Sequence, residues 1–127
     1  MSGSDVGKLL PYVFGALALI HVLPALALAA PAGLSRLYGF APGDQTLTTL
    51  LQHRALLFGL LAAALIYAVF VPATRWPVLI GAVVSMGGFI VIAGARGELS
   101  GALRPIVIAD VVGLFIAALA ALLLWKG

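Results

Sequence analysis

The sequence contains no cysteine and few charged residues, and both shortages narrow the chemistry available to the protein. Without cysteine, disulfides, thiolate metal sites, cysteine-ligated iron–sulfur clusters and a cysteine nucleophile are all excluded. Charged residues make up 9% of the 127 residues and hydrophobic residues 64%, and the mean hydropathy is +1.23. Soluble domains carry about 25% charged residues. The composition therefore predicts an integral membrane protein.

Several motifs that mark catalysis or ligand binding are also missing. The chain has no Gly-x-Ser-x-Gly elbow and no phosphate-binding glycine-rich loop. Its two histidines, His21 and His53, lack the close spacing typical of zinc ligands, so we expect no metal and no cofactor. The net charge is +3, but the seven basic residues are spread over the ends of apolar segments. There they suit lipid headgroups, and we expect no nucleic-acid partner.

Four apolar stretches follow one another along the chain. About 20 helical residues, each rising about 1.5 Å, cross a hydrocarbon core of about 30 Å. The second helix is expected to begin before its apolar run, because Asp44 is placed to cap it and residues 45–54 can form two or more turns. The pattern predicts an all-α, four-transmembrane-helix bundle that forms a single transmembrane domain over residues 1–127. The expected spans are residues 9–30, 47–71, 76–95 and 105–125.

The orientation of these spans depends on few basic residues. An even number of spans places both termini on the same side of the membrane. That side carries Lys8, Arg75 and Lys126, and the opposite side carries Arg36, Arg96 and Arg104, with Arg54 near the boundary. We expect cytoplasmic termini, because Arg54 and Arg104 have candidate partners inside the bundle. So small a bias also permits insertion in both orientations as an antiparallel dimer.

Asp110 is the only carboxylate inside an apolar run, the 21 residues from Pro105 to Trp125. An ionisable group at membrane depth is costly and usually faces the bundle interior. Gly113 and Ala117 lie three and seven residues further on, on the same helix face. Small residues are typical of helix contacts in membranes. We therefore expect Asp110 to face the interior.

Arg54 is the obvious partner for this carboxylate. The second and fourth helices begin at the same membrane face, so Arg54 and Asp110 lie at similar depth, where a bidentate contact can neutralise both charges. Arg104, six residues before Asp110, is an alternative, but it lies at another angle and nearer water. A purely structural pair that fixes the helix register is the other interpretation.

Other polar residues surround this pair. Gln52, His53 and Arg54 are consecutive and spread over about 200° of the helix, so they cannot all face the interior. We expect either Gln52 or Arg54 to do so. His21 lies about nine residues before the expected end of the first span. It is either a neutral imidazole hydrogen-bonded to a neighbouring helix or a group that handles protons or contacts a ligand.

Three stretches carry a resemblance to a known family. They are Arg36-Leu-Tyr-Gly-Phe40, His53-Arg-Ala-Leu-Leu-Phe-Gly-Leu-Leu61 and Ala109-Asp-Val-Val-Gly113. The chain resembles small four-span bacterial proteins of the DoxX-like superfamily, in which a Tyr-Gly after the first helix and an arginine early in the second recur. The resemblance assigns these features to Tyr38-Gly39 and Arg54. It implies a multi-pass bundle in the bacterial inner (cytoplasmic) membrane and, for some members, a place in quinone-linked oxidoreductases.

Three functions remain open, and whether the protein is an enzyme is among the open points. The first is an accessory or binding module that takes up a lipid, a quinone or another amphipathic molecule, alone, as a homodimer or in a larger membrane complex. Its expected ligand-binding residues are Arg54, Asp110, Gln52, His21 and Tyr38. The second is an acid–base isomerase, cyclase or hydrolase on an apolar substrate, with Asp110, His53 and His21 as candidate catalytic residues. The third is a proton-coupled transporter. We rank the first highest, and the absence of a second intramembrane acid favours it over transport.

Overall fold

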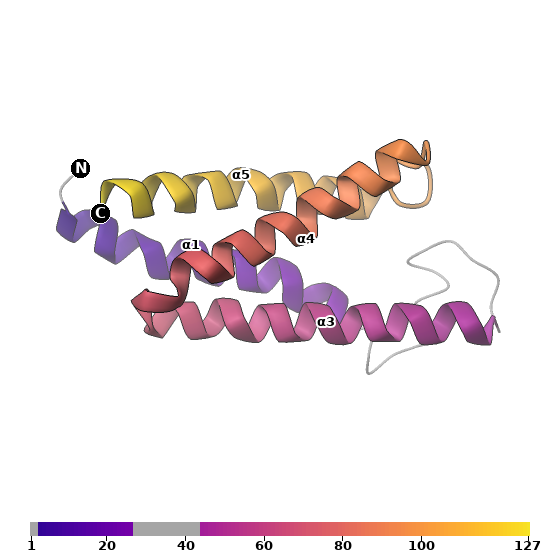
Figure 1. Cartoon of the computed structure of the whole chain (residues 1–127), viewed down its shortest axis with the longest axis horizontal. Coiled ribbons are helices and arrows are strands. Elements are labelled where there is room, and N and C mark those ends of the chain that lie inside the picture. Colours follow the sequence, from indigo (N-terminus) through magenta and orange to yellow (C-terminus); the bar gives the residue numbers. More distant parts are fainter. Residues whose placement is uncertain (1–2, 27–43) are drawn as a thin grey trace.

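The structure, a computed structural model, describes residues 3–26 and 44–127. Over these residues the chain forms four long α-helices and one short 3-10 helix (Figure 1). The elements are α1 (Gly3–Ala25), α3 (Gln45–Phe70), η2 (Pro72–Thr74), α4 (Arg75–Ala95) and α5 (Arg104–Lys126). All four long helices are long and apolar enough to cross a membrane. The predicted fold class, an all-α four-helix membrane bundle, is confirmed.

Length and surface chemistry agree on this assignment. The shortest long helix, α4, has 21 residues and is therefore about 31 Å long, enough for the hydrocarbon core. Large apolar side chains also cover the outside of the bundle, among them Tyr12, Phe70 and Phe115, each more than 70% exposed. A soluble monomer rarely exposes so much contiguous apolar surface. The chain is a multi-pass membrane protein whose outer face suits lipid.

The four helices form a closed ring. α1 packs against α3 and α5, and α4 packs against the same two helices, so that α3 and α5 lie diagonally across the bundle. Figure 1 shows α4 leaving α3 at their short connection and crossing towards the beginning of α5. The starts of α3 and α5 lie at one end of the bundle, together with the ends of α1 and α4. Residues early in α3 and α5 can therefore approach each other through the centre.

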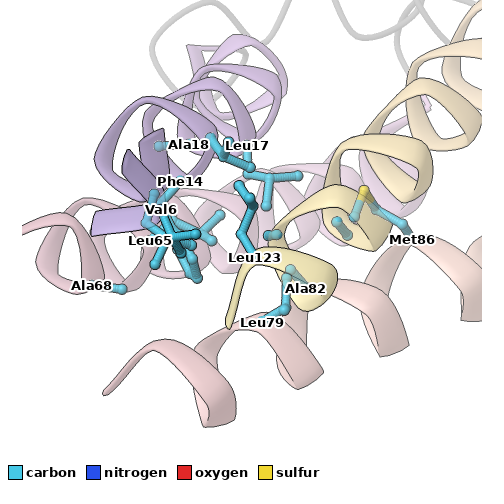
Figure 2. Packing of buried hydrophobic residues seen from close by; sticks show 14 residues of the cluster. Val6, Phe14, Leu17, Ala18, Leu65, Ala68, Leu79, Ala82, Met86 and Leu123 are labelled. Carbon is cyan, nitrogen blue, oxygen red and sulfur yellow. The ribbon is translucent and has the colours of Figure 1, made fainter. Parts of the chain in front are cut away.

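One half of the bundle is filled by apolar side chains, and we call it the packed half. It lies towards the beginning of α1 and the α3–α4 connection. Figure 2 shows the buried side chains of this half packed together. Phe14, Leu17, Leu65 and Met86 are fully buried there. In lipid, helix association depends on such close packing rather than on removal of apolar surface from water. The cluster comprises Val6, Leu10, Val13, Phe14, Leu17, Ala18, Leu65, Ala68, Leu79, Ala82, Met86, Ala117, Ala120 and Leu123.

Gly113 lies at a close contact between α4 and α5. A methyl group added at this glycine would collide with Sδ of Met86 on α4, and it would lie 3.7 Å from Cδ1 of Ile20 on α1. The glycine therefore allows three helices to meet at one level. This level lies about one helical turn from Asp110.

Helix ends in this fold are closed by local hydrogen bonds. At the start of α3, Asp44 Oδ1 accepts a hydrogen bond from the Leu47 backbone N–H at 3.0 Å, so the predicted cap is confirmed. At the end of α4, Gly97 has a φ of +69°. The Glu98 N–H donates to the Ala93 carbonyl at 2.8 Å, and the Gly97 N–H donates to the Gly94 carbonyl at 3.1 Å. This Schellman motif ends the helix and turns the chain towards α5.

Arg75, the first residue of α4, caps the last carbonyls of α3 with its side chain. The sequence pattern places it among the charges of the terminal side, yet its side chain is only 7% exposed. Its Nε donates to the Ala68 carbonyl at 2.9 Å, and its Nη2 donates to the Val69 carbonyl at 3.0 Å. The last carbonyls of a helix lack partners within the helix and carry partial negative charge. Arg75 supplies both the donors and the positive charge.

Candidate functional site

Asp110 lies on α5 and faces the interior, as its spacing to small residues predicts. Its side chain is 6% exposed, and Gly113 and Ala117 on the same face are buried. Its Oδ2 has no hydrogen-bond partner among the described residues. Buried polar atoms are almost always paired in native proteins. An unpartnered carboxylate oxygen at this depth is therefore a feature that needs a functional explanation.

His21 on α1 is the second buried polar group of this region, and its side chain is 1% exposed. Its Nδ1 lies 2.8 Å from the Leu17 carbonyl oxygen. A carbonyl oxygen only accepts hydrogen bonds, so Nδ1 carries the proton, and Nε2 of the neutral ring is an acceptor. Nε2 has no partner within residues 3–26 and 44–127. The bonded carbonyl is on its own helix, so the expected hydrogen bond to a neighbouring helix is wrong.

Arg54 on α3 is half-buried between two aromatic rings. Its guanidinium carbon lies 4.7 Å from the ring centroid of Phe58 and 4.7 Å from that of Phe89 on α4. Such cation–π contacts stabilise a cation away from water. The Arg54 charge also interacts electrostatically with Asp110 across the bundle. The spacing of Arg54 and Phe58, four residues apart on one helix, signals their contact in the sequence, whereas nothing there indicates Phe89.

The remaining predicted site residues fall in different places. Gln52 is half-buried on α3, and His53 is exposed on the same helix. His53 does not line the pocket that His21 and Asp110 share. Tyr38, which the resemblance singles out, lies outside the described residues. The structure thus brings His21 and Asp110 together with Arg54 nearby, and it leaves His53 apart from them.

A pocket of about 250 Å³ lies between α1, α3 and α5, and we call this part of the bundle the pocket half. Three of its lining residues, Leu23, Pro105 and Ala109, are exposed, so the pocket opens on the outer surface between the end of α1 and the start of α5. These exposed lining residues are all apolar, which suits contact with lipid. The pocket is lined by Ile20, His21, Leu23, Pro24, Phe58, Pro105, Ile106, Ala109 and Asp110.

Phe58 connects this pocket to the arginine. Its ring centroid is 5.7 Å from that of His21 and 4.7 Å from the guanidinium carbon of Arg54. Arg54 does not line the pocket itself, and it contacts the pocket lining through the Phe58 ring. The pocket therefore combines apolar walls with two polar residues, His21 and Asp110.

Two polar residues do not make a metal site. Zinc sites use at least three protein ligands. No group of three or more His, Cys, Asp or Glu side chains within residues 3–26 and 44–127 is arranged to hold a metal ion. What the geometry of the pocket does suit is a molecule that is mostly apolar and carries a polar head.

Fold and site together define a multi-pass membrane protein with four spans and a side pocket that ends in two buried polar groups. No protein-family model, no curated protein and no solved structure matches the chain. The functional argument therefore depends on the pocket itself.

Proposed function

We propose that this protein binds an amphipathic molecule from the bilayer in the pocket between α1, α3 and α5, and that it acts as a binding or accessory module. The observation that carries the proposal is that His21 and Asp110 line the same apolar pocket. His21 Nε2 and Asp110 Oδ2 are both buried, and neither has a hydrogen-bond partner in the described chain. A polar head group at these atoms would satisfy them. The apolar walls would hold the adjoining part of the molecule.

The size of the pocket limits how much of the ligand it encloses. An apolar cavity of about 150 Å³ accommodates benzene. The volume of about 250 Å³ found here suits a single substituted ring or a short stretch of chain. The remainder of a longer amphiphile would pass between α1 and α5 into the lipid. Lipids, quinones and similar molecules all have this build.

The resemblance to DoxX-like proteins supports the same proposal. It adds the bacterial inner membrane as the location and a quinone-linked complex as one setting for the module. The positive charge of Arg54 and the negative charge of Asp110 oppose each other, so the net charge around the pocket is small. This suits a ligand held inside a membrane.

An acid–base enzyme is the second candidate, and one observation favours it. His21 and Asp110, the two proton-exchanging groups of the pocket, both line the space where a substrate would lie. In this alternative His21 and Asp110 are the general acid and the general base, and the exposed His53 takes no part in the reaction.

The proposal is tested by identifying what the purified protein carries. We expect native mass spectrometry of the protein, extracted in mild detergent, to detect a bound amphiphile. The variant Ala109→Trp fills the pocket mouth and should lose it. The matched control Ala118→Trp lies on the same helix and is exposed, but it is away from the pocket. Equal occupancy in both variants would contradict the proposal, and so would a wild-type protein that carries nothing.

A further inference from the structure

We infer that the pocket selects a neutral hydroxyl donor, that is, an amphipathic alcohol or phenol, which hydrogen-bonds to His21 Nε2 and Asp110 Oδ2. This inference rests on the proposed function and names the chemistry of its ligand. It starts from the fact that the two unpartnered polar atoms that line the pocket are both acceptors.

The acceptor role of His21 follows from the hydrogen bond on the other side of its ring. The Leu17 carbonyl, 2.8 Å from Nδ1, holds the proton on that nitrogen. The His21 side chain is 1% exposed, and its ring packs on Phe58. A protonated imidazole would place a second cation beside the ring that Arg54 already contacts. The neutral ring therefore presents a lone pair to the pocket.

The acceptor role of Asp110 follows from its charge balance. An ionised carboxylate only accepts hydrogen bonds. The positive charge of Arg54, held by Phe58 and Phe89, is a nearby counter-charge for this carboxylate. A cationic head group would add a second positive charge, and an anionic head group would add a second negative charge. In a low-dielectric site either addition is unfavourable, so the ligand that fits is neutral.

Neutral head groups divide into those that donate and those that only accept. Ketones, ethers, esters and oxidised quinones have acceptors alone, and they would leave His21 Nε2 and Asp110 Oδ2 unpaired. An unpaired buried acceptor reduces binding by about tenfold or more. An O–H group donates to one of the two atoms directly. A molecule with two hydroxyls, or one with a co-bound water, satisfies both.

The test compares two probes that differ only in this donor. Delipidated protein with ¹⁵N-labelled histidine, in nanodiscs of saturated phosphatidylcholine, is titrated with 4-pentylphenol and with 4-pentylanisole. The His21 resonances are those that remain in His53→Gln, a variant of an exposed residue outside the pocket. Before titration, the Nε2 signal should be that of an unprotonated nitrogen. Concentrations are expressed per lipid, because the two probes partition differently.

We expect the phenol to shift the His21 Nε2 signal saturably, with half-saturation at a concentration at least about tenfold lower than for the ether. The shift should be lost in Ala109→Trp and kept in Ala118→Trp. Equal affinity for both probes would overturn the donor preference and leave the proposed pocket function standing. A response that persists in Ala109→Trp would place the phenol elsewhere and overturn the inference. If neither probe affects His21, both proposals fall.

Discussion

The two ends of this bundle treat buried polar groups in opposite ways. In the packed half, Arg75 is 7% exposed, and two of its nitrogens donate to the carbonyls of Ala68 and Val69. In the pocket half, Asp110 and His21 are buried to a similar degree, but Oδ2 and Nε2 have no partner in the described chain. Burial of a polar group in a membrane therefore does not mark a binding site by itself. The distinguishing features are an unsatisfied atom and an adjoining space.

The largest effect should come from removing the satisfied charge. Arg75→Met takes both donors away from the last carbonyls of α3 and leaves them unpaired. We expect it to lower the free energy of unfolding by about 3 kcal/mol. Thermal unfolding in detergent, followed by circular dichroism, measures this. Arg104→Met is the matched control, because Arg104 is exposed at the start of α5, and its effect should be small. Equal effects of the two variants would show that the Arg75 hydrogen bonds add nothing.

The next effect separates structure from binding in the pocket half. Asp110→Leu removes the negative charge that interacts with Arg54, and we expect it to destabilise the protein by about 2 kcal/mol. The double variant Arg54→Met/Asp110→Leu removes both charges and should recover most of that loss. Unfolding of all four forms in a double-mutant cycle measures the coupling.

Ligand binding should not recover in the double variant, because Asp110 Oδ2 is one of the two polar atoms proposed to contact the ligand. Native mass spectrometry of the same four proteins checks this. A double variant that is stable and retains its ligand would reduce the pair to a structural contact and remove Asp110 from the site.

The smallest expected effect is that of Ala109→Leu, which is compared with Ala82→Leu to test the packing of the two halves. Ala82 on α4 is fully buried in the packed half, and Ala109 on α5 lines the pocket. Ala82→Leu should destabilise the bundle by about 2 kcal/mol, because its added atoms have no space. Ala109→Leu should change stability by less than about 0.5 kcal/mol, because its added atoms enter the pocket. Thermal unfolding of both variants decides the point. A large loss from Ala109→Leu would mean that the pocket half is as tightly packed as the other half.

Much of the fold follows from hydropathy and local rules. The long apolar runs predict the helices, and Asp44 predicts the start of α3. The spacing of Gly113 and Ala117 to Asp110 predicts which face of α5 is inward, because a helix repeats every 3.6 residues whatever it packs against. The interior faces of the other helices are less predictable. On α4, the spacing of Gly81, Ser85 and Gly88 suggests a contact face of small residues. Gly81 is nevertheless exposed, and Ala82 beside it is buried.

The site was only partly predictable, because local patterns show which residues are polar but not which distant residues they contact. Asp110 and His21 stand out as polar residues in apolar runs, and the pocket includes both. Nothing local in the sequence distinguishes Arg75 from a charge at the membrane surface, because its burial depends on carbonyls six and seven residues earlier. The sequence does not reveal the contact of Phe89 with Arg54 either, because α4 brings that ring from a distant part of the chain. Contacts between helices are decided by packing, which no single segment encodes.

The contacts of Arg75 also bear on how the chain enters the membrane. Both of its hydrogen bonds stay within the hairpin of α3 and α4, whose helices are joined by a connection of four residues, Val71–Thr74. The hydrogen bonds of Arg75 therefore need neither α1 nor α5. During biosynthesis these two helices can partition into the bilayer as one unit, with no charged loop left to cross. The pocket, in contrast, needs residues of α1, α3 and α5 together, so it forms only once these three helices have packed.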